Sequence, residues 1–269
     1  MNYEFFIAKR IIGSKAYNSS ISAPIIKIGI AAIAIGIVVM MIAIATGIGL
    51  QQKIRDKVVA FNGHVTISNY DSNNSQESGK PISKNQDFYP EFHAVEGVKH
   101  VQAVASKFGV IRTETDFEGA YLKGVGADYN WDYFKEFLIE GRLPDYTSKR
   151  NEDILISEYL ANRLNFKVGD TFQMVFAKED PEKLPNIITY NIVGLFNSGF
   201  QDLDATYVIG DIRHLQRINR WKPNEIGSFE VFIEDYKQLE EKGLEIYHNT
   251  PSTFNTETIT GRYYSIFEW

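Results

Sequence analysis

The sequence predicts an α+β protein with one N-terminal transmembrane helix. One long apolar run is followed by many short stretches in which apolar and polar residues alternate. Residues 28–50 read IGIAAIAIGIVVMMIAIATGIGL, without a charged or amide side chain. At about 1.5 Å per residue this run forms a helix of roughly 35 Å, enough to cross a hydrocarbon core of about 30 Å. Beyond it, apolar stretches with the two-residue period of strands alternate with a few segments of helical period.

Two other interpretations of the apolar run fit less well. A secretory signal peptide has an apolar stretch of about 7–15 residues close to the N-terminus, whereas this run is longer and begins after residue 27. A buried core helix is rarely apolar on every face over such a length. The run is therefore expected to span a membrane and to contact lipids.

Small residues recur on the expected spanning helix. Ala32 and Gly36, and again Ala43 and Gly47, are separated by three residues. This spacing lets a second helix approach closely in the membrane. Because Gly and Ala are also common in membrane helices generally, helix packing and ordinary composition both remain open as explanations.

The charges beside the apolar run favour a cytoplasmic N-terminus by a small margin. Residues 1–27 carry four basic side chains and one acidic one, and residues 53–57 carry three and one. The positive-inside rule places the more basic flank in the cytoplasm. Tyr3, Phe6, Ile7 and Ile11 would share one face of a helix, which predicts an amphipathic segment on the cytoplasmic membrane surface.

The composition of the chain excludes several classes of function. The net charge is −6, and no dense Lys/Arg cluster suggests a nucleic-acid partner. The chain has no cysteine, so disulfides and thiol catalysis are excluded. Residues 51–269 are numerous enough for one large or two small domains.

The segment after the apolar run is expected to continue the helix as far as the pair Asn62-Gly63, which suits a left-handed helix end. A strand at 64–70 follows. A mobile loop rich in Ser and Asn is expected at 71–86, and a short helix around 88–95.

The remaining residues are dominated by expected strands, most of them antiparallel. Ser157, Asp211 and Asp235 each precede a helical pattern and are expected to act as N-caps, the second helix ending at Arg220 and the last near His248. The expected strands are 101–113 and 120–126, joined as a hairpin, and 154–157, 171–176, 187–196, 205–209 and 228–233.

No catalytic, metal or cofactor site can be assembled from the sequence. It contains no G-x-x-x-x-G-K-[ST], no H-E-x-x-H and no G-x-S-x-G motif. The five histidines lack metal-ligand spacing. Glu114, Asp116 and Glu118 could suggest a cation site, but a solvated hairpin tip explains them better. We therefore expect a protein that is not an enzyme and needs no cofactor.

One loop is a candidate for docking a partner. Residues 177–186 read AKEDPEKLPN between two expected strands, with an apolar tip formed by Pro181, Leu184 and Pro185. A rigid exposed loop of this kind suits protein recognition. An ordinary variable hairpin loop is the alternative.

Four stretches together resemble one family of membrane proteins. They are FFIAKRIIGSK at 5–15, QQKIRDKVVAFNGHVTI at 51–67, the segment from EGRLPD to GDTFQM at 140–174, and YNIVGLFNSGFQDLDATYVI at 190–209. The chain is similar in these stretches to the N-terminal half of FtsX-like ABC transporter permeases, particularly the lipoprotein-releasing (Lol-type) permeases and their macrolide-exporter relatives. Of the four stretches, the third, at 140–174, is the most specific to this family.

The resemblance implies a subunit with four membrane spans in the bacterial inner membrane. Such a subunit pairs with a second permease subunit, identical or paralogous, and with a separate cytoplasmic ABC ATPase that hydrolyses ATP. ATP-driven motion passes through the spanning helices to a periplasmic domain. We accordingly expect this sequence, which ends in the aromatic stretch RYYSIFEW, to be the N-terminal half of a longer permease or a truncated relative.

The resemblance also implies a division of the chain. Residues 1–27 would be the cytoplasmic amphipathic tail and 28–50 the transmembrane helix. Residues 51–100 and 222–269 would form a mixed α/β porter lobe, into which a β-rich lobe at 101–221 is inserted.

In lipoprotein-releasing permeases one subunit docks a periplasmic carrier through a hairpin hook. The loop 177–186 occupies the equivalent position here and is shorter than expected. The predicted function is therefore that of a permease subunit for lipoprotein release, with a periplasmic carrier or lipoprotein as a further partner. The alternative is a single-pass membrane-anchored extracytoplasmic sensor or adaptor. A membrane-tethered hydrolase ranks below both because no site supports it.

Overall fold

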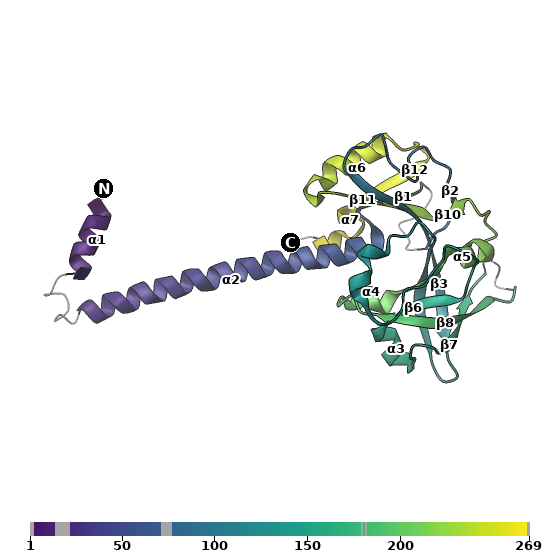
Figure 1. Ribbon diagram of the computed structural model, residues 1–269, viewed down its shortest axis with the longest axis horizontal. Coiled ribbons are helices and arrows are strands. Elements are labelled where there is room, and N and C mark those ends of the chain that lie inside the picture. The colour runs from purple at the N-terminus through teal and green to yellow at the C-terminus, as the bar shows by residue number, and fades with distance from the viewer. Residues whose placement is uncertain (1–2, 14–21, 71–76, 179, 181, 268–269) are drawn as a thin grey trace. The chain divides into compact units, whose positions relative to one another are not determined.

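The computed structural model describes residues 3–13, 22–70, 77–178, 180 and 182–267 (Figure 1). The chain divides into two compact units, residues 1–55 and residues 56–269.

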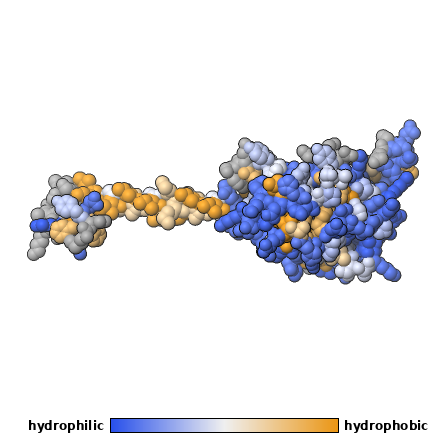
Figure 2. Space-filling model, turned by 90° about the horizontal axis from the view of Figure 1, so that it is seen from above, coloured by the Kyte–Doolittle hydropathy of each residue, from blue (hydrophilic) through white to orange (hydrophobic). Residues whose placement is uncertain are grey.

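The first unit is helical. Helix α1 spans Tyr3–Gly13, and helix α2 begins at Ser22 and ends at Asn62, so its last turns belong to the second unit. By length and composition, Pro24–Asn62 is long and apolar enough to cross a membrane. Its side chains between residues 24 and 50 are exposed, and Figure 2 shows apolar residues along this stretch. Such surface is unfavourable in water and favourable in a bilayer.

The end of α2 confirms the predicted helix end. The last helical residue is Asn62, and Gly63 has a φ of +70°. Its N–H donates to the carbonyl of Val59 at 2.7 Å, which closes the final turn. A Cβ at this position would lie 3.0 Å from the Cβ of Glu230, so glycine satisfies both the dihedral angle and the close packing.

The second unit is a mixed sheet with short helices (Figure 1). Its strands are β1 (Val65–Asn69), β2 (Ile82–Ser83), β3 (Val98–Arg112), β4 (Phe117–Val125), β5 (Leu138–Gly141), β6 (Asp153–Ser157), β7 (Thr171–Phe176), β8 (Asn186–Phe196), β9 (Tyr207–Asp211), β10 (Glu225–Ile226), β11 (Ser228–Ile233) and β12 (Phe254–Thr258). Its helices are α3 (Glu158–Leu164), α4 (Gln201–Thr206), α5 (Ile212–Ile218), α6 (Leu239–His248), α7 (Ile259–Arg262) and α8 (Tyr264–Phe267), with 3-10 turns at Trp131–Tyr133, Lys135–Phe137 and Tyr236–Gln238.

The strand pairings close a ring. The main sheet has the order β12-β1-β11-β3-β4-β9-β6-β8-β5, and β7 pairs with both β3 and β8, so that β3, β4, β9, β6, β8 and β7 form a closed circuit. The pairs β4–β9 and β6–β8 are parallel, and most others are antiparallel. The predicted α+β class with mostly antiparallel strands is therefore confirmed.

Apolar side chains fill the ring. Ile111, Leu122, Met174 and Phe176 are fully buried on its inner face. The N-terminal half of β3 leaves the ring and pairs with β11, which continues through β1 to β12. Strand β3 thus passes through the predicted lobe boundary at residues 100/101, and the division into a porter lobe and an inserted lobe stays a prediction.

Predictions from local sequence signals are mostly confirmed. Strands β7 and β11 have the predicted bounds, and the hairpin of β3 and β4 is present. Ser157 accepts from the N–H of Leu160, and Asp211 from that of Arg213, as predicted for N-caps. Asp235 caps the 3-10 turn that leads into α6.

Several predictions are wrong, each for an identifiable reason. The expected helix around 88–95 is absent from this described segment, since Pro90 lacks an N–H and Phe88 and Phe92 stack in the core instead. Strand β2 lies within the expected loop 71–86, of which 71–76 fall outside the described residues. Residues 205–206 end α4 rather than start a strand, and α5 ends at Ile218, two residues before the expected end.

Candidate functional site at the end of helix α2

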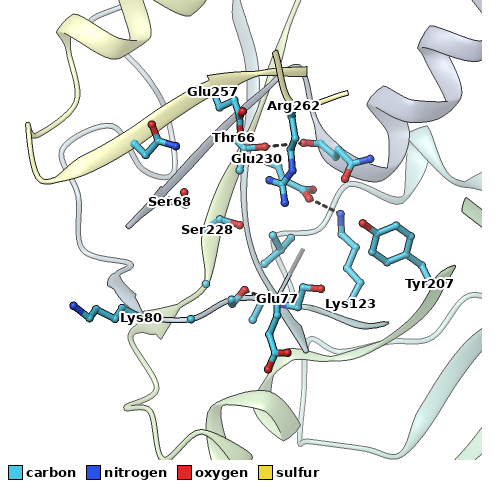
Figure 3. Close-up of a pocket in the computed structure, with 18 residues that line it drawn as sticks. Thr66, Ser68, Glu77, Lys80, Lys123, Tyr207, Ser228, Glu230, Glu257 and Arg262 are labelled. Carbon is cyan, nitrogen blue, oxygen red and sulfur yellow. Dashed lines mark hydrogen bonds and ion pairs between the residues drawn. The ribbon is translucent and has the colours of Figure 1, made fainter. Parts of the chain in front are cut away.

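The end of helix α2 is buried in the second unit, beside the pocket shown in Figure 3. The side chains of Val58, Val59, Ala60, Phe61 and Asn62 are all buried, none of them more than 8% exposed. We call these five residues and the side chains that hold them the α2 socket. Along the helix, the side chains change from exposed to buried within about two turns.

Aromatic side chains form one wall of the α2 socket. The ring of Phe61 lies 5.1 Å from that of Phe134, 5.7 Å from Phe196 and 6.0 Å from Tyr207, measured between centroids. Phe134 lies between the two 3-10 turns Trp131–Tyr133 and Lys135–Phe137, Phe196 is in β8 and Tyr207 is in β9. Three separate parts of the chain therefore contact one side chain. Edge-to-face and tilted contacts of this kind add stability beyond the buried area.

A buried ion pair forms the other wall. Lys123 of β4 and Glu230 of β11 are 5% and 6% exposed, and their ammonium and carboxylate groups are in contact. The Lys123 ammonium also donates to the carbonyl oxygen of Phe61, one of the acceptors left open at a helix C-terminus. The second oxygen of Glu230 accepts from Gln102 Nε2 at 2.9 Å. The charge therefore ties the end of α2 to β4, β11 and β3.

Burial lowers the pKa of the Lys123 ammonium below its usual value, and the Glu230 carboxylate opposes that shift. A buried charge is tolerated when it is paired and hydrogen-bonded. A cation at the C-terminal end of α2 also interacts favourably with the helix dipole. Both hydrogen-bonding partners of Lys123 are structural groups, so its role at this site is to hold the helix end.

A third connection reaches the segment after α7. Tyr263 donates its hydroxyl to Asn62 Oδ1 at 2.8 Å. Tyr207 is hydrogen-bonded to Tyr263 in turn, and burial raises the pKa of Tyr207 well above its usual value, so its hydroxyl stays protonated and can donate. The end of α2 and the residues near the end of the described chain are thereby linked through side chains.

A polar cavity of about 60 Å³ adjoins the α2 socket. Figure 3 shows Arg262, Thr66 and Glu230 around it, together with Ser228 and Lys123. Within the described ranges, no group of three His, Asp or Glu side chains is arranged to hold a metal ion.

The residues predicted from sequence lie elsewhere. Ala32, Gly36, Ala43 and Gly47 are exposed on α2, with no other atom within 4 Å of a Cβ built at either glycine. Leu184 is 83% exposed and Pro185 is exposed, between β7 and β8. Pro181 lies outside the described residues. The roles assigned to these positions stay predictions.

Sequence reasoning missed the residues of the α2 socket. A signal was present, because Lys123 interrupts the apolar stretch AYLKGV and Glu230 interrupts SFEVFI. A single charge within a short apolar strand points to a buried partner. The two residues are 107 positions apart, so the sequence gives no indication that they pair with each other.

Comparison with known proteins identifies the domain that holds α2. Residues 28–241 match the family described as the MacB-like periplasmic core domain. The chain belongs to this family. The match begins at the apolar part of α2 and includes Lys123 and Glu230 of the α2 socket. The predicted resemblance to FtsX-like, MacB-like and Lol-type permeases is thus confirmed at the level of the family.

The chain is also similar to curated proteins and to solved structures. The lipoprotein-releasing system transmembrane protein LolC of Xylella fastidiosa is 24% identical over 224 residues, which cover 80% of this chain and 50% of that protein. The chain therefore spans about half the length of the curated relatives it matches. The periplasmic region of MacB from Actinobacillus actinomycetemcomitans is 15% identical, with a TM-score of 0.47 over 78% of this chain and 96% of that one. The extracellular domain of the transporter YknZ from Gram-positive bacteria is 17% identical, with a TM-score of 0.43 over 72% and 99%.

Proposed function

We propose that this chain is part of a membrane subunit of an ABC transporter permease, and that α2 carries ATP-driven motion to the MacB-like core domain. The observation that carries the proposal is that α2, a helix long enough to span a membrane, ends buried in the sheet of that domain. When the buried end of α2 is displaced, the elements packed against it must move as well.

The α2 socket suits such a role because its contacts come from distant parts of the chain. Phe61 packs against side chains of three separate parts of the chain, and its carbonyl oxygen accepts from Lys123. Packed cores are stiff and switch between discrete arrangements rather than deforming smoothly. Movement of α2 along or about its axis would therefore shift β4 and β11 together.

The proposed partners are a cytoplasmic ABC ATPase and a second permease subunit. Ala32, Gly36, Ala43 and Gly47 fall within about 60° of one another at 100° per residue, so they share one face of α2. A face of small residues permits close approach of another membrane helix. The proposal places residues 1–27 in the cytoplasm and the core domain outside the inner membrane.

Lipoprotein release is the specific activity that we propose, on the basis of the 24% identity to LolC. The hairpin between β7 and β8 would then dock a carrier through Leu184 and Pro185, both of which are exposed. Pro181 belongs to the same proposed tip.

The test is to purify the full-length protein from the membranes of its own host in mild detergent. We expect an ABC ATPase to co-purify and ATP hydrolysis by the complex to be lost or uncoupled when Phe61 is replaced by Ala. An exposed aromatic of the same domain provides the matched control, in the variant Tyr247→Ala. Purification without any ATPase would contradict the proposal and favour a membrane-anchored sensor or adaptor.

Topology is tested separately with a reporter fused after Tyr70. Activity of an export-dependent reporter agrees with a cytoplasmic N-terminus. Activity of a cytoplasm-dependent reporter alone would overturn the proposed orientation.

A further inference from the structure

One face of the sheet in the second unit is polar and yet enclosed. Cross-strand pairs along β12, β1, β11 and β3 place eight side chains on this face in two rows. The first row is Glu257, Thr66, Glu230 and Gln102, and the second is Asn255, Ser68, Ser228 and Val104. All of them except Val104 are polar. We call these eight residues the polar sheet face.

The opposite face of the same strands belongs to the apolar core. It carries fully buried side chains such as Ile67 and Phe229. A sheet with one apolar and one polar face commonly turns its polar face to solvent. Here Thr66, Gln102 and Glu230 are at most 7% exposed. The polar sheet face is therefore covered by other parts of the chain, and its polar groups need partners away from bulk water.

The polar cavity of about 60 Å³ lies against this face, and every residue of the polar sheet face except Gln102 lines it. The rest of its lining includes Asn62 of α2, Lys123 of β4, Tyr207 of β9, Arg262 of α7 and the segment 77–80 (Figure 3). Ser78 holds this segment against β3, because its N–H donates to the Ser106 carbonyl oxygen at 2.7 Å. At about 10–15 Å³ for each water-sized group, the cavity can hold about four to six of them.

The charged side chains around the cavity are equally divided between the two signs. They are Glu77, Glu230, Glu257, Lys80, Lys123 and Arg262. Glu230 is paired with Lys123. Glu77 is paired with Lys107 at 2.8 Å, and Lys80 has an interaction of its own. One carboxylate and one guanidinium remain, those of Glu257 and Arg262.

These two side chains have charges that the protein does not pair. Both are half-buried, and neither side chain forms an ion pair or a hydrogen bond with a residue in the described part of the chain. A charge that is partly removed from water is unfavourable unless it is paired. Guanidinium binds a carboxylate through two parallel hydrogen bonds, and a carboxylate accepts equally well from an ammonium.

A third group at the cavity also lacks a partner. The hydroxyl of Ser106 is buried and has no hydrogen-bond partner among the described residues. Ser106 lies opposite Lys123 in the pairing of β3 with β4, and it lines the same cavity. A buried hydroxyl without a partner requires an explanation, and a polar occupant of the cavity supplies one.

We propose that the cavity binds a small zwitterion of the α-amino acid class, with its carboxylate on Arg262 and its ammonium on Glu257. Glycine and alanine have about as many non-hydrogen atoms as the cavity can hold. A ligand with a single charge would leave one of the two side chains unpaired. An anion would also be repelled by Glu257, and a cation by Arg262.

The site adjoins the end of α2, because Asn62 and Lys123 belong both to the cavity lining and to the α2 socket. A ligand that binds only the folded state increases its stability. The inference goes beyond the proposed function and does not rest on it. Amino acid binding can be measured whether or not an ATPase co-purifies, so either proposal can fail without the other.

The first experiment is equilibrium dialysis of radiolabelled glycine against the purified full-length protein in mild detergent. We expect saturable binding of about one glycine per chain. Glycolate has a hydroxyl in place of the ammonium, and glycinamide has an amide in place of the carboxylate, at nearly unchanged size. Each is expected to compete at least about tenfold more weakly than glycine, because one charge-assisted hydrogen bond is lost.

The second experiment assigns the two charges to their residues. Arg262→Gln and Glu257→Gln are each expected to weaken glycine binding at least about tenfold. Arg217→Gln and Glu241→Gln, at exposed positions outside the cavity, provide the matched controls and should bind as the wild type does. Near-ultraviolet circular dichroism checks that each variant is folded.

A change of selectivity separates recognition from a structural role of these residues. Glu257→Gln removes the carboxylate that repels an anion, so glycolate is expected to bind this variant at least as tightly as glycine does. A variant that only disturbed the fold would lose both ligands together. Ser228→Val, which places a branched side chain on the polar sheet face at the cavity, should weaken both.

Three results would overturn the inference. Lack of saturable glycine binding to the wild type would show that Arg262 and Glu257 pair with each other or with water alone. Equal competition by glycine, glycolate and glycinamide would show that the charges are not recognised. Unchanged affinity in both Arg262→Gln and Glu257→Gln would place the bound glycine elsewhere on the protein.

Discussion

The α2 socket and the loop between β7 and β8 represent two opposite ways of arranging polar groups in one domain. In the α2 socket, Lys123 and Glu230 are buried and all of their contacts are internal. In the loop, Lys183 and Asp180 are paired at the surface, and the neighbouring Leu184 is almost fully exposed. One arrangement joins distant elements, and the other presents side chains to solvent.

The difference concerns how far a perturbation can spread. A buried side chain that contacts several elements transmits any displacement to all of them, whereas an exposed loop moves without disturbing the sheet. The α2 socket is therefore suited to coupling, and the loop is suited to recognition. Substitutions in the two regions should differ strongly in their effect on stability.

The largest effect is expected from breaking the buried ion pair. Lys123→Met leaves the Glu230 carboxylate buried without a cation, which should lower the free energy of unfolding by about 3–5 kcal/mol. Urea unfolding of the full-length protein in detergent, followed by near-ultraviolet circular dichroism, measures this change. The exposed residue Lys237 provides the control, and Lys237→Met should change stability by less than about 0.5 kcal/mol.

The double substitution Lys123→Met with Glu230→Leu separates the effect of the ion pair on stability from its effect on the proposed transmission of motion through α2. Apolar replacement of both partners of a buried ion pair is often neutral, so most of the lost stability should return. The hydrogen bond to the Phe61 carbonyl does not return, and ATP-driven activity of the complex should stay impaired. Full recovery of both properties would show that the ion pair contributes only to folding.

An intermediate effect is expected from His214 in the same domain. Its ring is buried against Tyr190, and Nε2 donates to the carbonyl of Asn151 at 2.8 Å. Burial lowers the pKa of this imidazole below its usual value of 6.5, and the hydrogen bond to the Asn151 backbone and the nearby Asp211 carboxylate oppose the shift. The unfolded chain therefore binds a proton that the folded chain does not, in the window between the lowered pKa and 6.5.

It follows that stability from His214 is fully present above pH 6.5 and declines as the pH falls through that window. The slope contributed by one proton is at most about 1.4 kcal/mol per pH unit. Urea titrations at several pH values between 4 and 8 should show a smaller slope for His214→Gln than for the wild type. His248→Gln, at an exposed position, should keep the wild-type slope, and equal slopes for all three proteins would rule out His214 as the source.

The sequence predicts this fold well where the signal is local. Ser157 and Asp211 act as N-caps because a short polar side chain before a helical pattern needs no distant partner. Strand β12 was missed because its five residues alternate weakly and depend on pairing with β1, almost 190 residues earlier. The helix expected around residues 88–95 failed for the same reason, since Phe88 is packed against the distant Phe229.

The candidate site was harder to predict than the fold. The loop at 177–186 was found because it is contiguous and its prolines are visible in the sequence. The α2 socket joins Phe61, Lys123 and Glu230, which only the three-dimensional structure brings together. A local pattern thus reveals a surface more readily than it reveals a buried junction.

Leu184→Asp is expected to have the smallest effect on stability. It therefore distinguishes the loop between β7 and β8 most clearly from the α2 socket. This side chain is 83% exposed, so the free energy of unfolding should change by less than about 0.5 kcal/mol. If the loop docks a carrier, the same substitution should abolish co-purification of that partner, because a charge replaces the apolar tip. Leu244→Asp, at another exposed leucine, should leave co-purification intact. Retention of the partner by Leu184→Asp would remove the loop from the recognition surface.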